Sequence, residues 1–350
     1  MERIKVTVRE VIAETPDAFS LVLENHPGLD GYKAGQFVNV HCKVDGEETQ
    51  RSYSFSTSPL IDPYPVLTIK RVPRGKASNH LHKTIRGGDT LAISEPLGRF
   101  VLDEEALNGQ ILLIAGGSGI TPIFGLLKEG LERSSETQFT LVYANRNEDI
   151  IFQKALDGLA QKHQSRLDIH YFLEEGNLVD TPASVHKGRI TLEFLVELLK
   201  QSDMPLNEVT VYVCGPEGLM THCLTWLEKL GLSQGKIRTE YFTSSGSILQ
   251  YRALEKVTTS EVKLLNIKGK EQRLAVPQNI DILSEFLGQG YKLPHSCREA
   301  MCGSCAAKLV EGQVEMKENY ALNDAKLGEG YVLLCQSTPV SDRVILEYVR

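Results

Sequence analysis

Four of the seven cysteines of this chain are crowded near its C-terminal end, and their spacing constrains the fold more than any other feature. Cys297, Cys302 and Cys305 follow the pattern Cys-x4-Cys-x2-Cys, and Cys335 comes 29 residues later. Three thiolates on one loop can wrap a small inorganic core, which a distant fourth thiolate closes. The spacing therefore predicts a [2Fe–2S] cluster.

The alternative is a structural zinc site. Such sites favour paired Cys-x2–4-Cys arms, whereas this stretch contains one such arm. The residues between and after the ligands are small, which lets backbone N–H groups point at the sulfurs: Gly303, Ser304, Ala306 and Ala307. Both features favour the iron–sulfur interpretation.

Charge and hydropathy exclude several classes of function. The 350-residue chain has a net charge of −7, whereas a nucleic-acid partner requires a basic face. No apolar run approaches the roughly 20 residues that span a bilayer, and the sequence after Met1 shows no signal-peptide pattern. We therefore expect no nucleic-acid partner, no membrane insertion and a cytoplasmic location.

The pattern of apolar residues changes along the chain. Residues 1–105 contain short alternating runs broken by Gly and Pro, which predicts an antiparallel β-barrel. Residues 106–245 alternate continuous apolar runs with helical spacing, which predicts an α/β domain with a parallel sheet. A linker is expected over 246–259. Residues 260–350 suggest a hairpin and a helix before the cysteine loop.

These features together resemble a known family. Residues 1–245 resemble ferredoxin–NADP reductase, and residues 260–350 resemble a plant-type ferredoxin, for which the resemblance implies an α+β (β-grasp) fold. This order is similar to that of the reductase components of bacterial multicomponent oxygenases. Residues 310–314 and 330–337 resemble the reductase subunits of phenylacetyl-CoA epoxidases in particular.

The first flavin motif of that family, R-x-Y-S, is matched by Arg51, Ser52, Tyr53 and Ser54. A guanidinium can pair with the flavin pyrophosphate, a tyrosine ring can pack on the isoalloxazine, and a serine hydroxyl can bond flavin N5. The alternative is an ordinary strand with an exposed arginine and a buried tyrosine.

A second flavin motif lies within residues 63–88, a stretch with basic residues, Lys70 among them, and no acidic residue. Gly75, Lys76, Ala77 and Ser78 match the family's pyrophosphate turn, where a helix N-terminus presents backbone N–H groups. The resemblance implies FAD and not FMN. A solvated basic surface is the alternative.

The nicotinamide site is expected at a glycine-rich turn between a buried strand and a helix. Its candidate residues are Gly117, Ser118, Gly119 and Thr121. A second family segment, Cys214-Gly215-Pro216, would place the Cys214 thiol near nicotinamide C4. The alternative for Cys214 is a small buried apolar side chain.

The segment Glu240-Tyr241-Phe242 resembles the end of plant-type reductases, where an aromatic ring covers the flavin. By that resemblance Phe242 would lie on the flavin, and Glu240 would join Ser54 and Cys214 around N5 as the catalytic residues. The alternative is that Phe242 packs between the domains.

The choice between NADPH and NADH depends on charges after the second strand of the nucleotide domain. Asn145 and Arg146 stand there, and a cation at Arg146 favours the 2′-phosphate of NADPH over NADH. Glu148 and Asp149 follow closely, and Arg189 is a possible second cation.

We therefore expect an NAD(P)H-dependent oxidoreductase. Electrons would pass through FAD and a [2Fe–2S] cluster to a partner oxygenase, by resemblance of the phenylacetyl-CoA epoxidase type. A fatty-acid desaturase or another hydroxylase is an alternative acceptor. A redox-sensing module without turnover is the alternative from a different class.

Overall fold

The computed structural model describes residues 3–348 with gaps at residue 74, residues 202–207 and 243–258, and residues 268, 279, 297, 299 and 301. Two compact units make up the chain, residues 1–242 and 243–350, and each is described by itself. Most of the expected linker, 246–259, lies outside the described residues. Its last residue, Thr259, belongs to a strand because it pairs with Pro277, so the strand begins one residue earlier than predicted.

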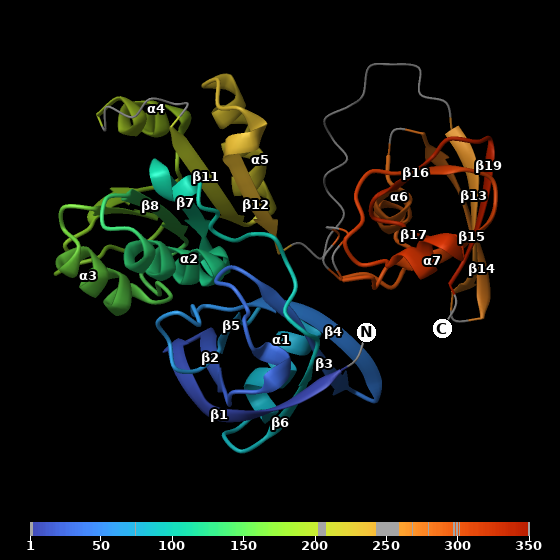
Figure 1. The fold of residues 1–350 in the computed structure, drawn as a ribbon, viewed down its shortest axis with the longest axis horizontal. Coiled ribbons are helices and arrows are strands. Elements are labelled where there is room, and N and C mark those ends of the chain that lie inside the picture. The colour runs from blue at the N-terminus through green and yellow to red at the C-terminus, as the bar shows by residue number, and fades with distance from the viewer. Residues whose placement is uncertain are drawn as a thin grey trace. The chain divides into compact units, whose positions relative to one another are not determined.

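The N-terminal domain of the first unit is an antiparallel barrel, as predicted (Figure 1). Val6 and Val8 point into its core while Lys5 and Thr7 are exposed, which is the period-2 pattern of a half-buried strand. The outer strands meet through a bridge between Phe55 and Leu67, which closes the sheet. The described sheet has the order β4-β3-β6-β1-β2-β5, with bounds β1 Ile4–Thr15, β2 Ala18–Leu23, β3 Phe37–Val44, β4 Glu47–Ser54, β5 Val66–Lys70 and β6 Thr90–Ile93.

The second domain of this unit is a parallel sheet of order β10-β9-β8-β7-β11-β12, again as predicted. The strands run β7 Gln110–Gly116, β8 Gln138–Asn145, β9 Leu167–Leu173, β10 Ser184–Lys187, β11 Val209–Gly215 and β12 Ile237–Tyr241. The helices run α2 Ile120–Arg133, α3 Gln153–Lys162, α4 Leu192–Gln201 and α5 Glu217–Lys229. Short 3-10 turns occupy Pro27–Leu29, Ala106–Asn108, Gly117–Gly119 and Gln234–Lys236.

Both faces of this sheet are covered, which explains the continuous apolar run of β7. Ile111 and Leu113 pack in one core with α2 and α3, whereas Leu112 and Ile114 pack in another with α4 and α5. Figure 1 shows the two helix pairs on opposite sides of the sheet. Alternate residues of one strand thus enter different cores, and none needs to be polar.

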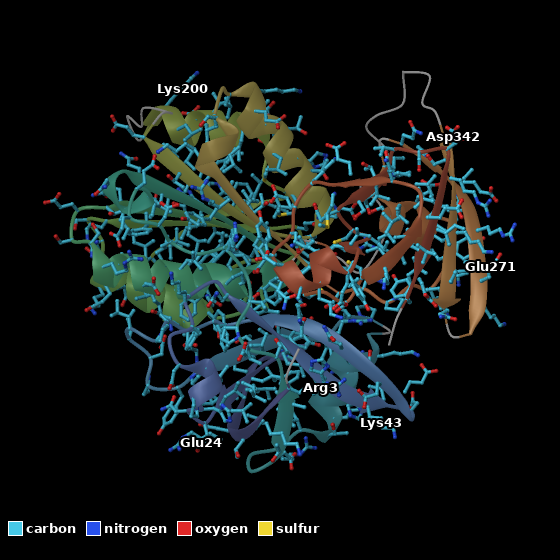
Figure 2. The ribbon with its side chains drawn as sticks, turned by 45° about the vertical axis from the view of Figure 1, so that its right-hand side comes forward. Arg3, Glu24, Lys43, Lys200, Glu271 and Asp342 are labelled. Atoms are coloured by element: carbon cyan, nitrogen blue, oxygen red, sulfur yellow. The ribbon has the colours of Figure 1, made fainter. Side chains whose placement is uncertain are left out.

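The barrel and the parallel sheet share an interface built by α2. Lys128 Nζ lies 2.6 Å from Asp62 Oδ2, and Ser58 Oγ donates to Glu129 Oε2 at 2.8 Å. Phe100, from the segment that follows the barrel, is in the same core as α2. Figure 2 shows Glu24 and Lys43 at the outer surface of the barrel. No helix in the described part of the chain is long and apolar enough to cross a membrane.

The second unit has the predicted α+β fold. Its larger described sheet has the order β14-β13-β19-β15-β17, with β13 and β19 parallel, and β16 pairs with β18. Helix α6 buries Ile282, Leu283 and Phe286 against this sheet, and the Asp281 carboxylate caps its N-terminus. The bounds are β13 Thr259–Ile267, β14 Lys270–Pro277, α6 Ile282–Gly288, β15 Ala306–Glu311, β16 Val314–Met316, α7 Asp324–Gly328, β17 Tyr331–Leu333, β18 Ser337–Pro339 and β19 Arg343–Glu347.

Candidate functional site

The first flavin motif occupies the end of β4. Arg51 is exposed, Tyr53 is half-buried, and Ser54 is buried. The Ser52 hydroxyl donates to Asn39 Oδ1 at 2.7 Å, across the β3–β4 ladder. Burial raises the pKa of Tyr53, so its hydroxyl stays protonated at neutral pH. Polar groups on this strand are therefore held in fixed positions beside the barrel core.

The second flavin motif forms the start of helix α1, Lys76–Thr84. Gly75 is the N-cap, and a Cβ on it would lie 2.3 Å from Val72 Cγ2 and 2.6 Å from Ser78 Oγ, so the turn requires glycine. The N-cap supplies no side-chain acceptor to the first-turn amides, which suits a helix end that binds an anion.

The basic side chains around this turn are partly engaged. Lys76 Nζ lies 3.6 Å from Glu47 Oε2, and both side chains are exposed. Lys70, at the end of β5, lies 3.6 Å from Asp17 Oδ2. Ala77 and Ser78 are buried against the barrel. Because exposed ion pairs are weak, a pyrophosphate can replace the carboxylates as partner of these lysines.

The glycine-rich turn lies between β7 and α2. Gly117 has a φ of +52°, and a Cβ there would point into open space, whereas a Cβ on Gly119 would lie 2.1 Å from the Cys214 carbonyl oxygen. Gly215 approaches Gly116 equally closely, since its Cβ would lie 3.0 Å from the Gly116 nitrogen. The two predicted nicotinamide segments are therefore in direct backbone contact.

Two side chains brace this turn. The buried Thr121 hydroxyl donates to the Ser118 carbonyl oxygen at 2.9 Å. The Tyr143 hydroxyl donates to the Gly117 carbonyl oxygen at 3.0 Å, from a side chain that is fully buried on β8. The sequence does not indicate Tyr143 as a site residue, because its position predicts only a buried strand.

Ser54 and Glu240 meet at the junction of the two domains. Ser54 Oγ donates to Glu240 Oε2 at 2.9 Å, and both side chains are buried. Glu240 lies on β12 directly beside Cys214 on β11, whose side chain is fully buried. The three residues expected around flavin N5 thus come together. Phe242 follows β12 and is 38% exposed.

The residues expected at the adenosine end lie at the carboxyl edge of the sheet. The buried Asn145 amide donates to the carbonyl oxygens of Asn147 and Asp149, so it braces the turn after β8. Arg146 follows it, with Nε 3.5 Å from Glu175 Oε1. Glu175 is a residue that the sequence did not indicate, since it follows a different strand.

The cysteine loop precedes β15. Cys302, Cys305 and Cys335 are buried, and Cys297 lies outside the described residues. Arg298, Ala300 and Gly303 have φ values of 61°, 60° and 65°, which gives the loop a tight left-handed path. The Leu334 amide donates to the Cys305 carbonyl oxygen at 3.2 Å and so ties the loop to the segment that carries Cys335.

The thiols of this loop interact with one another. A hydrogen bond from the Cys305 thiol, burial, and the charges of Cys305 and Cys302 raise the pKa of Cys335. Buried thiolates so close together repel each other unless cations neutralise them. This donor set fits an iron–sulfur cluster, which binds thiolates and supplies the iron charge.

Three family models match the chain in succession. The oxidoreductase FAD-binding domain matches residues 3–102, the oxidoreductase NAD-binding domain residues 113–224, and the 2Fe-2S iron-sulfur cluster binding domain residues 265–340. The predicted flavin, nicotinamide and iron–sulfur cofactors, in this order along the chain, are thereby confirmed.

Curated relatives span the full length of the chain. The ferredoxin reductase component of 3-ketosteroid-9-alpha-monooxygenase from Rhodococcus rhodochrous is 32% identical, over 98% of this chain and 96% of its own. A component of the 1,2-phenylacetyl-CoA epoxidase of Escherichia coli is 31% identical, over 98% and 97%. The chain belongs to the family of oxygenase reductase components. As such a reductase, it transfers electrons from NAD(P)H and carries FAD and a [2Fe–2S] cluster.

Another relative of this reductase serves a third type of oxygenase. The glycine betaine monooxygenase reductase subunit of Pseudomonas aeruginosa is 30% identical, over 97% of this chain and 93% of its own. Among solved structures, phthalate dioxygenase reductase has the same fold, with a TM-score of 0.60 and 22% identity over 99% of this chain and 98% of that one.

Proposed function

We propose that this reductase takes electrons from NADPH and delivers them to an oxygenase of the phenylacetyl-CoA epoxidase type. The hydrogen bond from Ser54 to Glu240, beside Cys214, is the observation that supports the redox assignment best. When bound, FAD accepts a hydride from the nicotinamide and releases its electrons one at a time toward the cluster.

The residues take three roles in this proposal. Ser54, Cys214 and Glu240 surround the site of hydride transfer. FAD is held by Arg51, Ser52, Tyr53, Ser54, Lys70, Gly75, Lys76, Ala77, Ser78 and Phe242. The dinucleotide is held by Gly117, Ser118, Gly119, Thr121, Asn145, Arg146, Cys214, Gly215 and Pro216. The cluster is held by Cys297, Cys302, Cys305 and Cys335.

The chain's own part in hydride transfer is to position groups and to exclude water. Ser54 and Glu240 are buried at 2% and 8% exposure, so their hydrogen bond is shielded from solvent. The Ser54 hydroxyl has one hydrogen and two lone pairs, so it can accept a bond from the flavin while donating to Glu240. Glu240 thus orients the hydroxyl.

The proposed partner rests on the C-terminal segments. Three oxygenase types occur among relatives at 30–32% identity, so overall identity does not choose between them. The segments 310–314 and 330–337 resemble the epoxidase reductases, and the second of them contains Cys335 and the residues that follow it.

Reconstitution tests this choice. The purified reductase is mixed with NADPH and, in separate reactions, with the oxygenase components of phenylacetyl-CoA epoxidase, 3-ketosteroid monooxygenase and glycine betaine monooxygenase. Oxygenated product is measured per NADPH consumed. We expect coupled turnover with the epoxidase components; coupled turnover with one of the others alone would reassign the partner.

The domain limits are also proposals: residues 1–105, 106–245 and 260–350, with 246–259 as the linker and Thr259 already in β13. Limited proteolysis followed by mass spectrometry checks them, because exposed linkers are cut before packed domains. We expect first cleavage within 246–258.

A further inference from the structure

Two arginine–glutamate pairs lie at the carboxyl edge of the parallel sheet. Arg146 Nε is 3.5 Å from Glu175 Oε1, and Arg189 Nη2 is 3.0 Å from Glu174 Oε2. We propose that Glu175 sets the preference between NADPH and NADH, because it competes with the adenosine 2′-phosphate for Arg146. This inference rests on the proposed assignment of Arg146 to the dinucleotide site.

The order of the strands places the adenosine at this edge. The nicotinamide must reach Ser54 and Glu240, which lie at the β12 end of the sheet, while the pyrophosphate lies at the Gly117 turn after β7. The rest of the dinucleotide therefore extends the other way, over β8 and β9. Adjacent strands are about 4.8 Å apart, so Arg146 and Glu175 are within reach of the ribose.

The backbone holds the two side chains together. The Glu175 amide donates to the Arg146 carbonyl oxygen at 2.8 Å, which continues the pairing of Asn145 with Leu173. Gly176, with a φ of +78°, allows a close approach of the loop after β8, since a Cβ there would lie 1.8 Å from Glu148 Oε2. Glu175 and Glu148 are consequently fixed near Arg146 whichever dinucleotide binds.

Charge then distinguishes the two donors. Arg146 is 81% exposed and Glu175 66% exposed, so their ion pair is weak and a phosphate can displace the carboxylate. A 2′-phosphate that takes Arg146 carries about two negative charges at neutral pH and meets the displaced Glu175 and Glu148. NADH lacks that phosphate and leaves the pair intact. Glu175 therefore weakens NADPH binding relative to NADH binding.

The test is a double-mutant cycle in the full-length holoenzyme. The kcat/KM values for NADPH and NADH are measured with ferricyanide as acceptor, so that no oxygenase is needed. We expect Glu175→Gln to raise the NADPH/NADH ratio about two- to fivefold, and Arg146→Ala to lower it. In the Arg146→Ala background, Glu175→Gln should leave the ratio unchanged, because the competition no longer exists.

Binding gives a second readout that is independent of turnover. By calorimetry, Glu175→Gln should tighten the binding of 2′,5′-ADP by the same factor and leave that of 5′-ADP unchanged. Glu24→Gln is the matched control: Glu24 forms an exposed pair with Arg9 at 2.9 Å, on the barrel surface seen in Figure 2. It should alter neither ratio nor binding.

The outcomes separate the two claims. An unchanged ratio in Glu175→Gln, together with a lowered ratio in Arg146→Ala, overturns the role of Glu175 and keeps that of Arg146. A shift of equal size in the Arg146→Ala background overturns the competition. An equal effect of Arg146→Ala on both donors overturns the assignment of Arg146, and the inference with it.

Discussion

The Ser54 hydroxyl donates a 2.9 Å hydrogen bond to the Glu240 carboxylate, although the two residues are 186 positions apart in the chain. Ser54 ends a strand of the barrel, and Glu240 lies on the edge strand β12 of the parallel sheet. The bond therefore links the proposed flavin site to the proposed nicotinamide site, in a place that water does not enter.

Removal of the Ser54 hydroxyl should slow hydride transfer. Ser54→Ala eliminates the group proposed to bond the flavin and leaves the buried Glu240 carboxylate without this donor. Loss of one oriented hydrogen-bond donor in a closed site commonly slows the chemical step by about 10²-fold. Stopped-flow measurement of flavin bleaching by NADPH checks this.

Ser56→Ala is the matched control for this experiment. Ser56 is equally buried in the barrel and shares a hydrogen bond with Thr68 at 2.9 Å, outside the flavin motif. This variant should lose about 1 kcal/mol of stability and keep the wild-type rate of flavin bleaching. If both variants bleach at the wild-type rate, Ser54 does not act on the flavin.

Gly119→Ala should disrupt the contact between the two nicotinamide segments. The added Cβ would lie 2.1 Å from the Cys214 carbonyl oxygen, and backbone atoms there cannot yield without moving β11. We expect a loss of about 1–3 kcal/mol of unfolding free energy and weaker NADPH binding. Gly218→Ala, where a Cβ meets nothing within 4 Å, should retain both. Thermal unfolding and calorimetry measure the two effects.

Tyr143→Phe should loosen the glycine-rich turn without leaving a cavity. It removes the hydroxyl that donates to the Gly117 carbonyl oxygen at 3.0 Å. We expect a stability loss of about 1 kcal/mol and a severalfold higher KM for NADPH. Tyr212→Phe removes a similar bond, to the Val101 carbonyl oxygen at 3.1 Å, and should reduce stability alone. Equal KM values in the two variants would argue against the bracing role of Tyr143.

Cys302→Ser should separate the two halves of electron transfer. Ferricyanide can be reduced at the flavin, whereas cytochrome c reduction requires the cluster, so we expect the first activity to persist and the second to be lost. Iron content and the visible spectrum report cluster loss directly. Cys223→Ala changes a buried cysteine on α5 and should retain both activities. Unimpaired cytochrome c reduction in Cys302→Ser would mean that the cluster is not the electron outlet.

Much of the fold follows from local patterns. The continuous apolar run of β7 predicts a strand covered on both faces, and Leu112 and Leu113 do enter different cores. Helix α6 is visible as an apolar stretch, and Asp281 before it is a typical cap. Such features depend on residues near one another in sequence, so the sequence reveals them.

The side-chain pairs that shape the site are less visible. The acids closest to Arg146 in the sequence are Glu148 and Asp149, but Glu175 reaches it from the end of the neighbouring strand β9. Likewise, the hydroxyl that braces Gly117 comes from Tyr143 on β8, which the sequence indicates only as a buried aromatic. These contacts depend on strand order and register, which a single sequence does not reveal.

The Ser54–Glu240 bond and the contact of Gly119 with Cys214 both lie within the unit that ends at Phe242. The geometry around the hydride therefore makes no use of the residues that bind the cluster. A different one-electron carrier, joined after Phe242, would leave that geometry intact. Such an arrangement allows gene fusion to exchange the electron-delivering module while the oxidation of the pyridine nucleotide is inherited unchanged.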